Sequence, residues 1–105
     1  MKIALFPNYE RQGTAELFLK INKILASLNV ECCSNDKLTD EECYELCDVI
    51  ITIGGDGTLI KHAKEAARYG KACLGVNTGN LGFLANVDKD TMGFPDNWQE
   101  LLKKV

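Results

Sequence analysis

The chain has 105 residues, of which 46% are hydrophobic, and a formal net charge of −3. This length fits one small domain, and the apolar share is large enough for a hydrophobic core. The mildly acidic balance, with no segment rich in Lys and Arg, argues against nucleic acid as a partner. No run approaches the roughly 18 apolar residues of a membrane span, and no export signal is present, so we expect a cytoplasmic protein without membrane contact.

The first element is predicted as a strand over Ile3–Phe6, a continuous apolar run that ends at Pro7. A helix is predicted to open at Thr14, because apolar residues then recur at helical spacing until a stop near Asn29. A second short strand fits Val30–Cys33.

The segment Thr39-Asp-Glu-Glu42 has the capping-box pattern and predicts a short helix that runs to about Leu46. The β-branched run Val49–Ile53 is the strongest strand, and Ala72–Val76 is a fourth, with a helix between them. A last helix is predicted to begin at Asp96. Strands alternating with helices predict an α/β fold, a Rossmann-like three-layer domain with a mainly parallel sheet.

The chain has five cysteines, which is an odd number, and we see no export signal. Both features argue against a disulfide framework. Cys43 and Cys47 would share one face of a helix, but one histidine and the lack of a Cys-x-x-Cys pair argue against zinc. We therefore expect reduced cysteines that act as small core or surface residues.

The most informative segment is Gly54-Gly-Asp-Gly-Thr58, which lies between a buried strand and a helix. Glycines at the carboxyl end of a parallel strand let backbone N–H groups approach phosphate oxygens, beside the positive end of the next helix. A carboxylate such as Asp56 is unfavourable among phosphates unless it accepts a proton from an attacking hydroxyl or holds Mg²⁺. The plainer alternative is a tight turn with Asp56 as a helix cap.

A second loop, Gly75-Val-Asn-Thr-Gly-Asn-Leu-Gly-Phe-Leu84, follows the fourth strand. If that strand neighbours the third, both loops open at one edge of the sheet and wall a single crevice. Asn77, Thr78 and Asn80 offer hydrogen-bonding groups for a ribose or a base. Phe83 offers a flat apolar face there, unless it belongs to the core.

Together the two loops resemble the NAD kinase family. That family pairs Gly-Gly-Asp-Gly-Thr with a downstream Gly-[Ile/Val]-Asn-x-Gly-x-Leu-Gly-Phe-Leu, and both motifs stand here in the right order, at residues 54–58 and 75–84. The first motif is shared with diacylglycerol and sphingosine kinases. The second motif narrows the assignment to the NAD kinase family. The resemblance is close over about residues 47–87.

The resemblance implies that Asp56 is the base acting on the 2′-hydroxyl of the adenosine ribose of NAD. The positions that match NAD-binding residues are Asp56, Gly57, Lys61, Asn80 and Phe83. The positions that match neighbours of the donor phosphates are Gly54, Gly55 and Thr58. Lys61 can instead be a solvated residue of the polar helix face, and His62 is expected to be a surface residue without a role.

The implied activity is the transfer of the terminal phosphoryl group of ATP, or of polyphosphate, to NAD, with Mg²⁺ or another divalent cation, making NADP. NAD and ATP are the implied small-molecule substrates, and the full-length protein is expected to be a homo-oligomer. Family members also carry a β-rich domain with an Asn-[Glu/Asp] motif, and nothing after Val87 resembles it. We therefore expect residues 1–105 to be an N-terminal α/β domain that is inactive by itself.

Two alternatives stay open. A lipid kinase of the diacylglycerol type shares Asp56 and its glycines, although those enzymes usually continue with Asn-Glu where this chain has Leu59-Ile60-Lys61. A non-catalytic nucleotide-binding or oligomerisation module is the other alternative. The intact Asp56 argues against it, whereas the missing β-rich domain argues for it.

Overall fold

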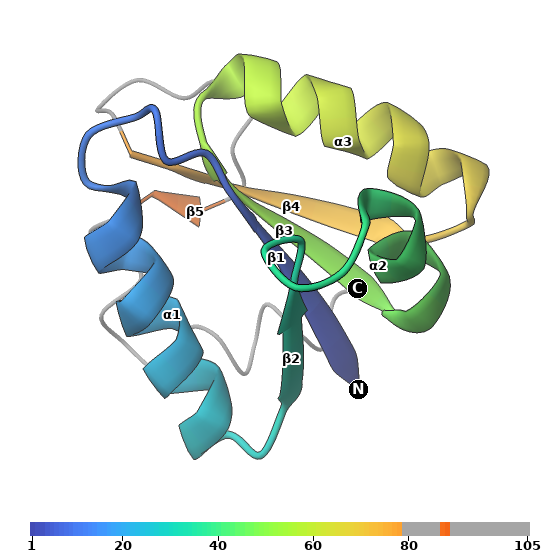
Figure 1. Cartoon of the computed structure of the whole chain (residues 1–105), viewed down its shortest axis with the longest axis horizontal. Coiled ribbons are helices and arrows are strands. Elements are labelled where there is room, and N and C mark those ends of the chain that lie inside the picture. The colour runs from blue at the N-terminus through green and yellow to red at the C-terminus, as the bar shows by residue number, and fades with distance from the viewer. Residues whose placement is uncertain (79–86, 89–105) are drawn as a thin grey trace.

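The computed structural model describes residues 1–78 and 87–88 (Figure 1). Its elements are β1 Lys2–Pro7, α1 Thr14–Ser27, β2 Glu31–Ser34, α2 Asp40–Leu46, β3 Val49–Gly54, α3 Asp56–Arg68, β4 Ala72–Asn77 and β5 Val87–Asp88. The predicted order of strands and helices is confirmed, while the short β5 was not predicted. The helix expected from Asp96 lies outside the described residues. None of the helices in these ranges is long and apolar enough to cross a membrane.

The sheet has the strand order β2-β1-β3-β4-β5, and all its neighbours pair in parallel. The α/β class and the parallel sheet are therefore confirmed. β3 is flanked by β1 and β4, as in the pairs Ile51 with Leu5 and Ile51 with Leu74. The loops after β1, β3 and β4 consequently leave the sheet at the same edge.

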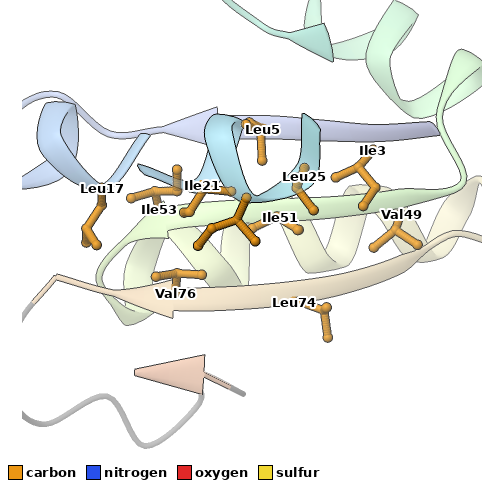
Figure 2. Packing of buried hydrophobic residues seen from close by; sticks show 11 residues of the cluster. Ile3, Leu5, Leu17, Ile21, Leu25, Val49, Ile51, Ile53, Leu74 and Val76 are labelled. Atoms are coloured by element: carbon orange, nitrogen blue, oxygen red, sulfur yellow. The ribbon is translucent and has the colours of Figure 1, made fainter. Parts of the chain in front are cut away.

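One face of the sheet is covered by α1 (Figure 2). Leu17, Ile21 and Leu25 lie on the helix face that meets the sheet, where they pack with Ile3, Leu5, Ile51 and Ile53 of the strands. The helix therefore carries its apolar residues at the predicted three- and four-residue spacing.

The opposite face of the sheet is covered by α2 and α3, so the domain has three layers. A second hydrophobic core lies on this face. It consists of strand residues such as Phe6 and Ile50 together with Tyr44 from α2 and Ala66 from α3. Burial on both faces is why β1 and β3 have mostly apolar sequences, with Thr52 as a buried polar residue of β3, rather than alternating ones.

A capping box starts α2 as predicted. The Thr39 hydroxyl accepts a hydrogen bond from the Glu42 backbone N–H at 3.1 Å, and the Glu42 carboxylate accepts one from the Thr39 N–H at 3.1 Å. These bonds satisfy two donors that the helix itself leaves unpaired.

Four of the five cysteines belong to the second core, Cys43 and Cys47 within it and Cys33 and Cys73 packed against it. Cys43 and Cys47 are buried, and the Cys33 sulfur lies 2.7 Å from that of Cys47. Burial, followed by the neighbouring Cys33, raises the pKa of Cys43 and of Cys47 to about 12. All five cysteines are free thiols, and these two act as small core residues.

α3 packs closely against β4 because β4 carries a glycine at the contact. A Cβ added at Gly75 would lie 2.7 Å from Cδ2 and 3.0 Å from Cδ1 of Leu59, whose side chain is buried. The backbone of β4 therefore serves as the floor on which Leu59 rests.

We predict that Gly75→Ala lowers the free energy of unfolding by about 1–3 kcal/mol, because the buried Leu59 side chain must move to admit the methyl group. Urea denaturation measures this change. Gly57→Ala is the matched control, since a Cβ there meets nothing within 4 Å. Equal stability of the Gly75→Ala variant and the unsubstituted protein would contradict the close packing of α3 on β4.

Candidate functional site

A pocket of about 620 Å³ lies at the edge of the sheet where β1 and β3 end. Its lining residues come from the loops after β1, β2 and β3 and from α2 and α3: Pro7, Asn8, Tyr9, Glu10, Arg11, Asn35, Asp40, Gly55, Asp56, Gly57, Thr58, Lys61 and His62. This is the edge at which open parallel sheets bind their ligands.

The glycine loop brings the start of α3 to this pocket. Gly55 is the N-cap of the helix, and the first intrahelical bond runs from the Leu59 N–H to the Gly55 carbonyl at 3.2 Å. The N–H groups of Asp56, Gly57 and Thr58 precede that bond, so no helical carbonyl accepts from them. They are free donors at the positive end of a 13-residue helix, the kind of group to which an anion can bind.

The positions of this loop are occupied by glycine for different physical reasons. A Cβ at Gly54 would lie 3.0 Å from the Thr58 hydroxyl and 3.1 Å from the Asn8 Cβ, so packing excludes a larger residue there. A Cβ at Gly57 would meet nothing within 4 Å, and Gly57 is not among the residues with positive φ. Within the described part of the chain, neither the backbone nor packing therefore requires a glycine at position 57, which leaves open space at the start of α3.

The loop after β1 is fastened to the glycine loop through Asn8. Its backbone N–H donates to the Ile53 carbonyl at 2.8 Å, and its side-chain amide donates to the Thr58 hydroxyl at 3.1 Å. Its side-chain oxygen accepts from the Glu10 N–H at 3.1 Å. One asparagine thus holds Thr58 in place and shapes the loop that faces it.

The loop after β4 joins the same network. The Thr78 N–H donates to the Gly54 carbonyl at 3.0 Å, and the Thr78 hydroxyl accepts from Arg11 Nε at 3.2 Å. The prediction that the loops after the third and fourth strands meet at one edge is therefore confirmed for Gly54 and Thr78. Asn80 and Phe83 lie outside the described residues.

The sequence did not single out Asn8 or Arg11. Both follow a strand that carries no glycine motif, so nothing local distinguishes their loop from an ordinary polar turn. Only the strand order, with β1 beside β3, puts this loop against Gly55 and Thr58.

The structure brings most of the predicted site residues together. Asp56 and Thr58 are half-buried in the pocket wall, and Gly57 and Lys61 are exposed there. Gly55 lines the pocket too, whereas Gly54 lies behind it, at the end of β3.

The expectation that His62 is a surface residue is wrong. Its side chain is 6% exposed, its Nδ1 lies 2.8 Å from the Tyr44 hydroxyl, and its ring meets Phe6 edge-on at 4.4 Å between centroids. The buried face of α3 consists of Leu59, His62 and Ala66. Histidine is a polar residue type that is more often exposed in a helix of this kind, so the sequence pattern did not reveal its burial.

Burial lowers the pKa of His62; the charge of Asp40 opposes this and that of Lys61 adds to it. The neutral ring is therefore favoured in the folded protein. In that form it keeps its hydrogen bond with Tyr44 without carrying a buried charge.

Known proteins are similar to this chain over most of its length. The sequence model described as ATP-NAD kinase N-terminal domain matches residues 6–105. A protein named NAD kinase from Bacteroides fragilis is 41% identical over 96% of this chain and 33% of its own length. Another, from Shewanella frigidimarina, is 42% identical over 79% of this chain and 24% of its own length. The chain thus spans about a quarter to a third of the curated relatives described here.

A solved structure supports the fold alone. The CMP N-glycosidase BcmB of Clostridium botulinum aligns with a TM-score of 0.56 and 16% identity, over 98% of this chain and 99% of that one.

We predict a pH-dependent loss of stability through His62. Below about pH 6.5 the unfolded chain binds a proton that the buried, folded His62 does not, so unfolding becomes easier as the pH falls towards the lowered folded pKa. Above about pH 6.5, His62 is neutral in both the folded and the unfolded chain, so this loss of stability is absent. Since the chain has one histidine, NMR titration of its ring protons should report a midpoint below about 6.5.

His62→Gln is the corresponding variant. Its free energy of unfolding should vary less between about pH 5 and pH 7 than that of the unsubstituted protein, because glutamine has no proton to gain. Lys64→Gln, at an exposed position of the same helix, is the control. The same pH slope in both variants would rule out the His62 contribution.

Proposed function

The chain belongs to the NAD kinase family, whose N-terminal domain it matches, and from this premise we propose that it supplies the glycine-loop half of an NAD kinase active site. The full-length protein then transfers the terminal phosphoryl group of ATP, or of polyphosphate, to the 2′-hydroxyl of the adenosine ribose of NAD. In this proposal residues 1–105 are the N-terminal α/β domain, and a β-rich C-terminal domain completes the site.

The observation that carries this proposal is the open space at Gly57. A glycine with no positive φ and no crowded Cβ, beside three helix N–H groups without helical acceptors, leaves room for a ligand and offers it donors. Asp56 stands at the same point and supplies a carboxylate to the pocket. Family membership favours NAD as the occupant over the lipid of a diacylglycerol-type kinase.

The reaction asks two things of these residues. The new bond joins the ribose 2′-oxygen to the terminal phosphorus, the bond to the leaving phosphate oxygen breaks, and the hydroxyl proton passes to Asp56. The donor phosphates are received by Gly55 and Thr58 at the start of α3, with Gly54 shaping the turn behind them. Such positioning supplies most of the rate in phosphoryl transfer, and a general base adds about 10²- to 10⁴-fold.

The other predicted site residues are proposed to bind NAD. Gly57 and Lys61 line the pocket beyond Asp56, and Asn80 and Phe83 are proposed to contact the adenine side. Lys61 is exposed, and its ammonium group is available to an anionic ligand. The proposed homo-oligomer, the cytoplasmic location and the lack of nucleic-acid partners remain predictions.

Mg²⁺ enters this proposal with the donor phosphates. The described residues contain no group of three or more His, Cys, Asp or Glu side chains suited to a metal ion. Mg²⁺ does not need such a cage, because it commonly binds one or two carboxylates together with substrate phosphates and water. Asp56 fits that limited demand and would hold the ion in the alternative in which it does not act as the base.

We predict that Gly57→Ala weakens NAD binding by the full-length protein about tenfold or more, because the methyl group would occupy ligand space. Calorimetry measures this affinity. The same change should leave stability unaltered or raise it by about 0.5 kcal/mol, since alanine favours a helix. Unchanged NAD affinity in Gly57→Ala would remove the observation on which this site depends.

For Asp56→Asn in the full-length enzyme we predict a fall in kcat of about 10²-fold or more, with NAD affinity kept within about tenfold. Asparagine has nearly the same shape but cannot take the proton. If Asp56 instead holds Mg²⁺, the loss should shrink as Mg²⁺ is raised, so kcat is measured across a Mg²⁺ series.

Asp48→Asn is the control for that series, since Asp48 is exposed and binds the Lys2 backbone N–H at 2.9 Å, away from the pocket. It should behave as the unsubstituted enzyme. Near-normal kcat of Asp56→Asn at every Mg²⁺ level would exclude Asp56 from the chemistry.

A further inference from the structure

We propose that Arg11 binds the phosphate chain of the phosphoryl donor, reaching across Gly55 to meet phosphates held at the start of α3. The inference rests on the proposed function and adds to it a residue from the loop after β1, outside both family motifs. The ligand chemistry that it assigns is a linear di- or triphosphate.

The guanidinium of Arg11 lies directly against the glycine loop. A Cβ added at Gly55 would be 2.9 Å from its Nη1 and 3.2 Å from its Cζ. The absence of a side chain at Gly55 is therefore what lets the arginine approach the N-cap of α3. The N–H groups of that helix start and the guanidinium thus border the same pocket.

Arg11 is held in this position by one of its nitrogens. Nε donates to the Thr78 hydroxyl at 3.2 Å, which ties the loop after β1 to the loop after β4. The ion pair found among the described residues joins Arg68 to Glu65, so within that part of the chain no carboxylate neutralises Arg11. Its Nη1 and Nη2 groups keep the fork geometry that binds two oxygens of a phosphate.

The charges of the pocket lining favour such a cation. Among the described residues, three acids line the pocket, Glu10, Asp40 and Asp56, against two basic residues, Arg11 and Lys61. A polyphosphate enters an acidic pocket favourably only where a cation lies beside its path. Arg11 is the one that lies against the glycine loop, so it serves the phosphates that this loop receives.

Arg11 recognises the phosphates of the donor and does not contact its nucleobase. A guanidinium fork recognises anionic oxygens, so ATP and inorganic polyphosphate should depend on Arg11 alike. In the proposed function the donor phosphates, and not the diphosphate of NAD, are received at Gly55, where the Arg11 guanidinium lies. NAD binding should therefore not depend on Arg11, and this difference is the point that the experiment tests.

The test uses the full-length protein with Arg11→Ala, Arg11→Lys and Arg68→Ala. Arg68 is an exposed arginine at the end of α3, outside the pocket, and is the matched control. The KM values for ATP, for inorganic polyphosphate and for NAD are measured separately. Binding of inorganic tripolyphosphate and of NAD is measured by calorimetry, which gives a readout that does not depend on turnover.

We expect Arg11→Ala to raise the donor KM and the Kd of tripolyphosphate by about 10- to 100-fold, the usual effect of losing a charge-assisted hydrogen bond. Arg11→Lys should fall between, because lysine keeps the charge without the fork. Arg68→Ala should match the unsubstituted protein, and the Kd of NAD should stay unchanged in all three.

Thr78→Val separates phosphate binding from a purely structural role. It removes the partner of Arg11 Nε but keeps the guanidinium, so it should weaken tripolyphosphate binding far less than Arg11→Ala. Equal losses in the two variants would overturn the proposal in favour of a loop clamp. Normal tripolyphosphate binding by Arg11→Ala, or a matching loss of NAD affinity, would overturn it as well.

Failure of the proposed function would give a different result from failure of the Arg11 proposal. It would appear as an unsubstituted protein that forms no NADP from NAD with either donor. Tripolyphosphate binding would still decide whether Arg11 binds a phosphate chain.

Discussion

The parallel pairing of β3 with β1 on one side and β4 on the other is the constraint on which the rest of the structure depends. Parallel strands deliver all their following loops to one edge, so three loops far apart in sequence meet there. Their meeting is secured by a few bonds, from Asn8 to Ile53 and Thr58, from Arg11 to Thr78, and from Thr78 to Gly54. The pocket is a consequence of strand order before it is a consequence of any single motif.

The glycines at this edge of the sheet fall into two groups, those that close packing requires and those that leave space in the pocket. Gly54 and Gly75 are small because neighbouring side chains leave no room, which lets the loop after β1 and α3 approach the sheet. Gly57 is small although nothing crowds it, and Gly55 admits the guanidinium of Arg11. A glycine motif that looks uniform in sequence therefore combines residues that build the frame with residues that leave space for a ligand.

Polar groups under the pocket are kept neutral where they are buried. The pKa of His62 is lowered by burial, and its ring bonds the Tyr44 hydroxyl instead of carrying a charge. The pKa values of Cys43 and Cys47 are raised by the same effect. Charged side chains lie instead in the pocket wall, on Asp56, Lys61 and Arg11, where they are not fully buried.

The sequence by itself determined the α/β class, the order of the elements down to the capping box at Thr39, and the glycine loop around Asp56. These follow from local chemistry, namely apolar period, turn residues and caps, which a short window contains. The tertiary structure alone decided that Asn8 and Arg11 face Thr58 and Gly55, and that His62 is buried. Such contacts depend on which strands are neighbours and on which helix face meets the sheet, and no local pattern carries that information.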